Sequence, residues 1–178
     1  PHVGLLWGRR ELMEGLEAYK LRPSPDSLPG KWMTGTQNHE CLAGTLAAID
    51  YLAGLGRRVS GQSGLSRRDA LRSAFEAIRD YESDLIWKLI EGIQALPEYT
   101  LYGISDRSRA AERLPTISIR HATRSPRELA QALGERGLFV WHGNYYAQPL
   151  TERLGLEPDG MNRLGLVHYN TSEEVDRV

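Results

Sequence analysis

Arg163 stands in a short, otherwise apolar segment that follows a loop rich in polar and aromatic side chains. A guanidinium offers a planar fork of donors that matches a carboxylate, and such a charge-assisted contact contributes roughly 1.5–3 kcal/mol. A rigid strand would hold that fork in one direction. The pattern therefore favours an arginine that binds a carboxylate, and the alternative is an arginine that pairs with a nearby Asp or Glu.

The loop His142-Gly143-Asn144-Tyr145-Tyr146 is the second segment that could contact a ligand. It gathers donors, acceptors and aromatic rings between an expected strand and an expected helix. Side chains at the end of a strand often reach a site. The alternative is a turn with partly buried tyrosines.

The triplet Gly35-Thr36-Gln37 is the third candidate, because it precedes a helix expected to begin at Asn38. Backbone N–H groups at a helix start, together with a hydroxyl, can hold a phosphate. An ordinary N-terminal cap is the alternative explanation of the same residues.

Three adjacent residues at 39–41 are of types that bind metals, and three more histidines could join them. These are His39, Glu40 and Cys41, with His121, His142 and His168. Adjacent helical residues point to different faces, and spacings such as HExxH or CxxC are absent from the sequence. We therefore predict no metal site, and we interpret Cys41 as a small core residue.

Composition limits the classes of partner. The chain has 178 residues with a formal net charge of −1, so it is long enough for one domain with a real core and has no overall field that would attract nucleic acid or anionic membrane. It has one cysteine, and no apolar run approaches the ~20 residues that span a bilayer. We expect a cytosolic protein with small-molecule or protein partners.

The chain begins at Pro1 without a methionine or a signal-peptide pattern, and it ends at Val178 within an expected amphipathic helix. These ends are typical of a fragment of a longer protein. We therefore expect further sequence upstream.

The elements expected in the first half are mostly helical. They are a strand at 3–7, a helix at 9–16, a loop at 21–30, a helix from Asn38 to about Leu55, and a long helix from Ser66 to about Leu96. Gly54 and Gly56 are expected to end the first long helix. The second is expected to bury one stripe, formed by Leu71, Phe75, Ile78, Leu85, Leu89 and Ile93.

The second half alternates strands and helices. We expect strands at 99–102, 116–120, 138–142 and 163–168 and helices at 126–136 and 147–154. Ser125 and Glu128 are expected to form a capping box at the start of the first of these helices, and Thr171 and Glu174 are expected to form one at the start of a last helix. These elements should place Arg163 beside the 142–146 loop.

Four segments, taken together, resemble the C-terminal half of cysteine desulfurase-like proteins in the class V aminotransferase family. They are residues 1–8, 34–40, 143–150 and 162–177, in the order and spacing of that family. The family consists of pyridoxal phosphate enzymes of fold type I. The resemblance implies an α/β chain made of the end of the large cofactor-binding domain, residues 1–35, and an interdomain helix with the C-terminal small α/β domain, residues 36–178.

The resemblance also implies roles for particular residues. Arg163 matches the arginine that binds the substrate α-carboxylate, with His142, Asn144 and Tyr146 as further substrate contacts. Gly35 and Thr36 match the segment that reaches the cofactor phosphate of the other subunit of a homodimer. The lysine that forms the Schiff base with pyridoxal phosphate would lie upstream of Pro1, so the chain alone is expected to be inactive.

Three positions depart from the family pattern. Tyr146 stands where relatives that form a persulfide have a cysteine, Trp141 replaces an arginine, and Gln37 replaces a proline. A phenol cannot accept sulfur as a thiolate does. The resemblance therefore implies an enzyme that acts on an α-amino acid by a desulfurase-like or aminotransferase-type reaction. The alternative is a non-enzymatic remnant used for dimerisation or partner binding.

Overall fold

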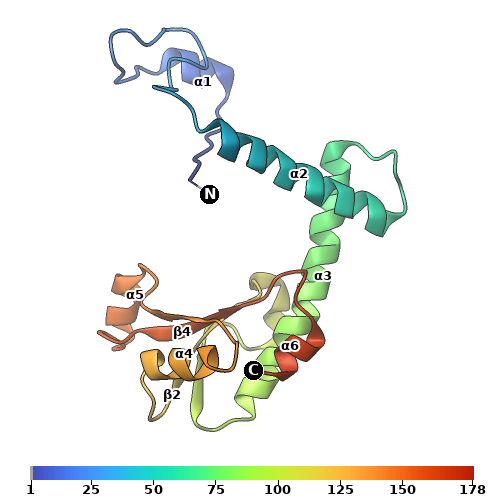
Figure 1. The fold of residues 1–178 in the computed structure, drawn as a ribbon, viewed down its shortest axis with the longest axis vertical. Coiled ribbons are helices and arrows are strands. Elements are labelled where there is room, and N and C mark those ends of the chain that lie inside the picture. The colour runs from blue at the N-terminus through green and yellow to red at the C-terminus, as the bar shows by residue number, and fades with distance from the viewer. Residues whose placement is uncertain (1) are drawn as a thin grey trace. The chain divides into compact units, whose positions relative to one another are not determined.

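A computed structural model describes residues 2–178 of the chain (Figure 1). The chain divides into two compact units, one ending at Ala74 and the other comprising Phe75–Val178. This division falls inside helix α3, Arg67–Gln94. This division does not test the domain boundary expected at residue 35, which stays a prediction.

The first unit is built from helices and an ordered loop. It contains α1, Arg10–Gly15, α2, His39–Ser60, and the start of α3. The expected strand at 3–7 is wrong, because residues 2–9 have no regular structure. A strand needs a hydrogen-bonding neighbour, whereas a helix satisfies its own backbone, and no strand lies within residues 2–74 to pair with this segment.

Helix α2 begins as expected and ends later than expected. The Asn38 side chain accepts a hydrogen bond from the Cys41 amide at 3.0 Å, which caps the first turn. The helix continues to Ser60 and stops at Gly61, whose φ is 68°. Gly54 and Gly56 do not terminate it, because Gly56 is a packing position against α3. A Cβ at Gly56 would lie 1.7 Å from the Ala70 carbonyl oxygen.

The loop between α1 and α2 is irregular, as expected, and is tied down by side chains. The Trp32 indole donates to the Met13 carbonyl at 3.0 Å, and the Lys31 ammonium donates to the Glu14 carbonyl at 2.8 Å. These contacts satisfy backbone groups that no helix or strand pairs.

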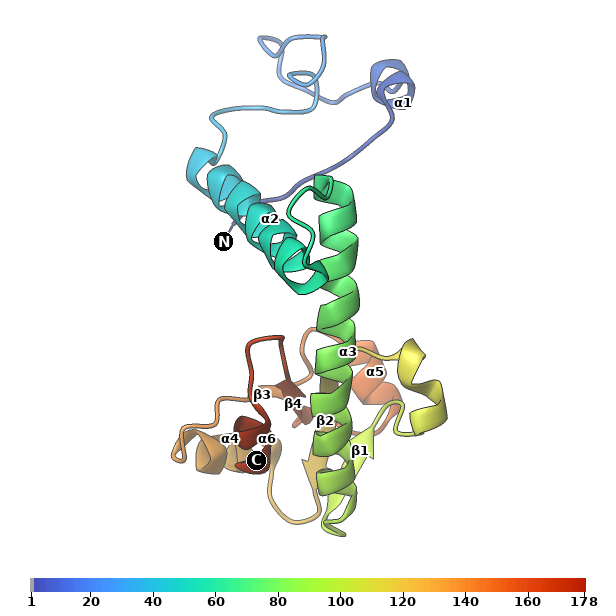
Figure 2. The ribbon, with the colours of Figure 1, turned by 90° about the vertical axis from the view of Figure 1, so that its right-hand side faces the viewer.

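The second unit contains a four-stranded antiparallel sheet in the order β1-β2-β4-β3 (Figure 2). Its strands are β1, Tyr99–Tyr102, β2, Thr116–His121, β3, Trp141–Gly143, and β4, Met161–Gly165. Its other elements are the part of α3 from residue 75 onward, a 3-10 helix, η1, Arg107–Glu112, and three further α-helices, α4, Pro126–Gly134, α5, Gln148–Arg153, and α6, Ser172–Asp176.

All four expected strands exist, but the last two are displaced along the chain. The strand expected at 138–142 forms at Trp141–Gly143, and the one expected at 163–168 forms at Met161–Gly165. Pairing between β3 and β4 sets these limits, with Trp141 opposite Arg163 and Gly143 opposite Met161. Local β-propensity does not contain this pairing information.

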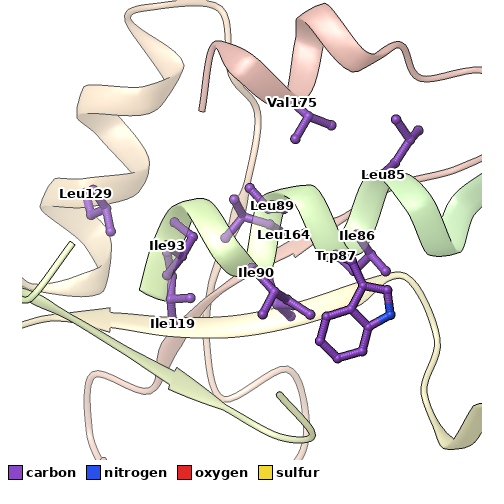
Figure 3. Packing of buried hydrophobic residues seen from close by; sticks show 11 residues of the cluster. Leu85, Ile86, Trp87, Leu89, Ile90, Ile93, Ile119, Leu129, Leu164 and Val175 are labelled. Carbon is purple, nitrogen blue, oxygen red and sulfur yellow. The ribbon is translucent and has the colours of Figure 1, made fainter. Parts of the chain in front are cut away.

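Helices α3 and α4 cover the same face of the sheet. Side chains from both helices join Ile117 and Ile119 of β2, Leu164 of β4 and Val175 of α6 in one buried cluster (Figure 3). Leu85, Leu89 and Ile93 of the expected stripe on α3 are buried there, as predicted. Phe75 is an error in that stripe, because its side chain is 56% exposed.

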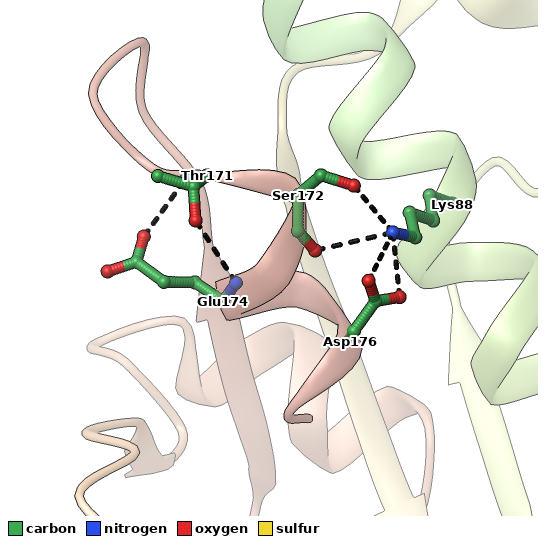
Figure 4. A network of polar contacts seen from close by, with 5 residues as sticks. All are labelled: Lys88, Thr171, Ser172, Glu174 and Asp176. Carbon is green, nitrogen blue, oxygen red and sulfur yellow. Dashed lines mark hydrogen bonds and ion pairs between the residues drawn. The ribbon is translucent and has the colours of Figure 1, made fainter.

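The two capping boxes expected at α4 and α6 are confirmed. Ser125 and Glu128 cap α4, and Thr171 and Glu174 cap α6. Helix α6 is also anchored to α3 by Lys88, whose ammonium contacts Ser172 at 2.5 Å and Asp176 at 2.7 Å (Figure 4).

Candidate functional site

The face of the sheet opposite the core carries the candidate site. Side chains alternate along a strand, so Ser118 faces away from the cluster that its neighbours Ile117 and Ile119 enter. Ser118 lies opposite Arg163, and Arg163 lies opposite Trp141. These three residues from β2, β4 and β3 therefore form a row on one open face.

The Arg163 guanidinium packs on the ring of Tyr145. Its central carbon lies 5.1 Å from the ring centroid, within the range of a cation–π contact. Among residues 2–178, no Asp or Glu forms an ion pair with Arg163. By contrast, Arg120 on β2 lies 3.7 Å from the Asp159 carboxylate. The described residues therefore do not form the alternative arrangement, in which Arg163 pairs with a nearby Asp or Glu.

Tyr145 presents a neutral ring to this arginine. Burial raises the pKa of the Tyr145 hydroxyl well above its usual value, and Ser118 and the Arg163 charge only partly offset the effect. The phenol is therefore protonated at neutral pH, and its π face is available to the guanidinium.

The loop that carries Tyr145 has an uncommon backbone. Tyr145 has a φ of 55° and Tyr146 a φ of 61°, and Gly143 has a φ of 108°. Non-glycine residues in the left-handed region cost about 1–3 kcal/mol each and persist when surrounding contacts hold them. The loop therefore stores strain next to the arginine.

Hydrogen bonds hold this backbone. The Asn144 side-chain oxygen accepts from the Tyr146 amide at 3.2 Å, and the Asn144 side-chain nitrogen donates to Glu157 at 3.3 Å. The hydroxyl of Thr151, which is fully buried, donates to the same Glu157 oxygen. Asn144, Glu157 and Thr151 thus connect the loop to α5 and to the segment before β4.

A close backbone contact holds the loop on another side. A Cβ at Gly160 would lie 2.1 Å from the carbonyl carbon of Gly143, and Gly160 has a φ of 67°. Only glycine fits this position without displacing the loop.

The other three residues predicted to contact the substrate lie in different environments. Asn144 lies in the loop beside Tyr145, with its amide engaged as described. His142 pairs with Asn162, which is buried on the core side, so His142 belongs to the opposite face of β3 from Trp141. Tyr146 is fully exposed, at 103%. Their roles as substrate contacts stay predictions.

Gly35 and Thr36 belong to the first unit, just before the cap of α2. Gly35 has a φ of 71°, and nothing lies within 4 Å of a Cβ placed on it. Thr36 is exposed. The Gln37 side chain donates to the carbonyls of Thr34 and Gly35 at 3.4 and 3.2 Å, which orders the turn. An accessible hydroxyl at the start of a helix fits a phosphate group, so these residues are compatible with the pyridoxal phosphate that the resemblance implies.

Within residues 2–178, no group of three or more His, Cys, Asp or Glu side chains is placed to hold a metal ion. In the same part of the chain, no helix is both long and apolar enough to cross a bilayer.

Comparison with known protein families supports the resemblance that the four sequence segments indicate. The family model described as aminotransferase class-V matches residues 3–178. The chain belongs to this family. The class-V match covers both units, so the resemblance seen in the four sequence segments extends over the described chain.

Curated relatives of this class-V chain include several named cysteine desulfurases. The aminotransferase-like protein FGM3 of Gibberella zeae is 31% identical over all of this chain and 41% of its own length. A cysteine desulfurase of Pectobacterium carotovorum is 27% identical over 99% of this chain and 40% of its own length. The chain therefore spans about two fifths of the length of the relatives it matches.

Solved structures show the same fold. The cysteine desulfurase CsdA from Escherichia coli superimposes with a TM-score of 0.66 at 22% identity, over 96% of this chain and 39% of that one. The apo cysteine desulfurase from Thermococcus onnurineus gives a TM-score of 0.65 at 23% identity, over 84% and 31%. The predicted fold class, part of a fold type I enzyme of this family, is confirmed.

Sequence reasoning did not single out four residues that build the class-V chain's candidate site. They are Ser118, Tyr145, Glu157 and Gly160. Tyr145 was one of two adjacent tyrosines in the loop, and nothing in the sequence distinguishes the one that packs on Arg163. An Asp-Gly pair at 159–160 signals a turn, but not that the turn meets Gly143.

Proposed function

We propose that the chain is part of a pyridoxal phosphate-dependent enzyme that acts on an α-amino acid, by a desulfurase-like or class V aminotransferase-type reaction. The observation that carries the proposal is Arg163, a guanidinium without an acidic partner in residues 2–178, held against Tyr145 on the open face of the sheet. Its role is to bind the substrate α-carboxylate and to orient the amino group and Cα toward the cofactor.

The cofactor contact is proposed for Gly35 and Thr36, with the Thr36 hydroxyl on the phosphate of the other subunit of a homodimer. In this assignment, residues 1–35 belong to the end of the large domain, and residues 36–178 form the interdomain helix and small domain. When bound, pyridoxal phosphate supplies an electron sink for charge that develops at the substrate Cα. Binding and orienting the substrate is what this chain's own residues contribute.

The reaction type depends partly on Tyr146. A phenol at the position of the family's sulfur-accepting cysteine does not form a persulfide. Any sulfur released by the full-length protein would therefore pass to an acceptor other than residue 146. Membership of the family argues against the alternative of a non-enzymatic remnant. A cytosolic location stays a prediction.

Replacing Arg163 tests the proposal in the full-length protein loaded with pyridoxal phosphate. Arg163→Ala should weaken the binding of L-amino acids about 10- to 150-fold, which corresponds to a charge-assisted contact of roughly 1.5–3 kcal/mol. Arg163→Lys should recover only part of the loss, since an ammonium lacks the planar fork. The measurement is a titration of the visible absorption of the bound cofactor with L-alanine and L-cysteine.

Arg127→Ala provides the matched control, because Arg127 is an exposed arginine on α4 outside the site. It should bind as the wild type does. If Arg163→Ala bound amino acids as tightly as Arg127→Ala, the role proposed for Arg163 would be wrong.

A further inference from the structure

The Tyr145 ring restricts the Arg163 guanidinium without using up its donors. The Tyr145 ring centroid lies 5.1 Å from the central carbon of the guanidinium, whereas the N–H groups of a guanidinium point outward in its own plane. A carboxylate binds a guanidinium edge-on in that plane. The described residues give the guanidinium no ion pair that would occupy this edge. The ring therefore contacts the arginine, while the N–H groups that a carboxylate needs have no acidic partner within residues 2–178.

The position of the ring depends on the loop. Tyr145 and Tyr146 have left-handed backbones, and three contacts hold the loop that carries them. Asn144 binds the Tyr146 amide, Glu157 binds Asn144, and Gly160 lies against the backbone of Gly143. None of these loop contacts uses the Arg163 side chain, so the loop can fix Tyr145 before a ligand arrives.

We propose that Tyr145 is a positioning residue that presets the plane of the Arg163 guanidinium, with Glu157 and Gly160 holding the loop that carries it. The ligand is an α-amino acid, and Tyr145 and Arg163 together recognise its carboxylate. This inference rests on the proposed function of Arg163. Tyr145 is then a second residue, besides Arg163, that determines specificity for the substrate carboxylate.

The test compares L-alanine with L-alaninamide, which lacks the carboxylate charge. The full-length protein loaded with cofactor is titrated with each compound, and the ratio of the two apparent Kd values measures carboxylate recognition. Tyr145→Leu should lower the preference for L-alanine about 3- to 30-fold, the range expected from losing a cation–π contact. Tyr145→Phe keeps the ring and should retain the wild-type ratio. Turnover of Tyr145→Leu should show a raised KM with a nearly unchanged kcat.

Chemical labelling provides a readout that needs neither cofactor nor activity. Phenylglyoxal labels accessible guanidinium groups, and peptide mass spectrometry measures the labelling of Arg163 relative to the exposed Arg127. Tyr145→Leu should label Arg163 faster than the wild type and Tyr145→Phe do. Equal labelling of Arg163 in all three proteins would overturn the positioning role of Tyr145.

Gly160→Ala is a second variant that does not alter the Tyr145 side chain. Its Cβ would meet the Gly143 backbone at 2.1 Å, so it should shift the loop and lower the L-alanine preference in the same direction. Gly134→Ala, at a position with nothing within 4 Å of a Cβ, is its control and should keep the wild-type ratio. If Gly160→Ala kept the wild-type ratio of the two apparent Kd values, the loop contact at Gly160 would not be what positions Tyr145.

The outcomes separate the two levels of inference. If Arg163→Ala abolishes the preference for L-alanine and Tyr145→Leu does not change it, the positioning role of Tyr145 is wrong and the role of Arg163 stands. If Arg163→Ala itself keeps the preference, the proposed function fails, whatever Tyr145 does.

Discussion

At the scale of single residues, two glycines of α2 have different reasons for being glycine. Gly44 has nothing within 4 Å of a Cβ placed on it, so its position is open. A Cβ on Gly56 would lie 1.7 Å from the Ala70 carbonyl oxygen of α3, which no small adjustment relieves. Gly56 allows the two helices to approach closely, while Gly44 only weakens its own helix.

Alanine at these two positions should therefore have opposite effects. Gly56→Ala should lower the free energy of unfolding of the first unit by about 1–3 kcal/mol or more, as overpacking does. Gly44→Ala should be neutral or raise it by up to about 1 kcal/mol, because alanine favours the helix. Urea denaturation followed by far-UV circular dichroism measures both. Equal effects of the two changes would contradict the close packing of α2 on α3.

At the scale of elements, α6 shows how a very short helix is held. It spans only Ser172–Asp176, and isolated helices of this length do not form in water. The capping box of Thr171 and Glu174 satisfies its first amides, and Lys88 of α3 binds its two ends (Figure 4). Local signals in the sequence identified the cap, and the contact with α3 comes from tertiary structure.

The cap of α6 should make stability depend on pH. Hydrogen bonds from the Asn170 side chain and then the Thr171 amide lower the pKa of Glu174 below its usual value. A lowered folded-state pKa contributes stability that is present above the ordinary glutamate pKa of about 4.3 and is lost as pH falls through the folded value. Glu174→Gln should therefore be less stable than the wild type at pH 7, and the gap should close towards pH 3.

Urea unfolding at pH 7, 5 and 3 measures this gap. Thr171→Ser retains the capping hydroxyl and should follow the wild-type profile. A gap between wild type and Glu174→Gln that stays constant over this range would rule out the charged cap as its cause.

At the scale of the whole molecule, the second unit has one core on one side of its sheet. Helices α3 and α4 cover that side, and Ile90 of α3 is completely buried in it (Figure 3). The opposite side carries Ser118, Arg163 and Trp141. Packing against the core thus fixes the position of the sheet, and the sheet fixes the position of the Arg163 backbone.

Truncating Ile90 should destabilise this unit strongly. Ile90→Ala should cost about 2–5 kcal/mol of unfolding free energy, because it leaves a cavity in a packed core. Leu150→Ala on α5 removes a side chain that is 53% exposed and should cost less than about 1 kcal/mol. The urea midpoints of both variants check the difference. Similar losses would mean that Ile90 does not lie in the main core.

Much of the fold was predictable because its signals are local. Asn38, Ser125 and Thr171 were recognised as helix caps, and a capping residue acts on amides within its own first turn. Errors came where a distant partner decides. The segment 3–7 has β-forming residues without a neighbouring strand, and Gly56 looks like a terminator until α3 is packed against it.

The candidate site divides in the same way. Arg163 could be selected from the sequence because a charged fork in an apolar strand needs a reason, and the resemblance to the family supplied one. The ring that packs on Arg163 could not be selected, since the resemblance pointed to Tyr146 and nothing in the sequence assigned a role to the adjacent Tyr145. Their left-handed backbones turn Tyr145 onto the guanidinium and leave Tyr146 exposed.

By itself, the sequence determined the family, the identity and order of most helices and strands, and the arginine at the centre of the site. These depend on side-chain types, spacing and contacts within a few residues. Tertiary structure alone decided the ends of β3 and β4, the face on which Arg163 stands and the residue that orients it. The physical reason is that strand register and loop conformation depend on hydrogen bonds and packing between residues far apart in the chain.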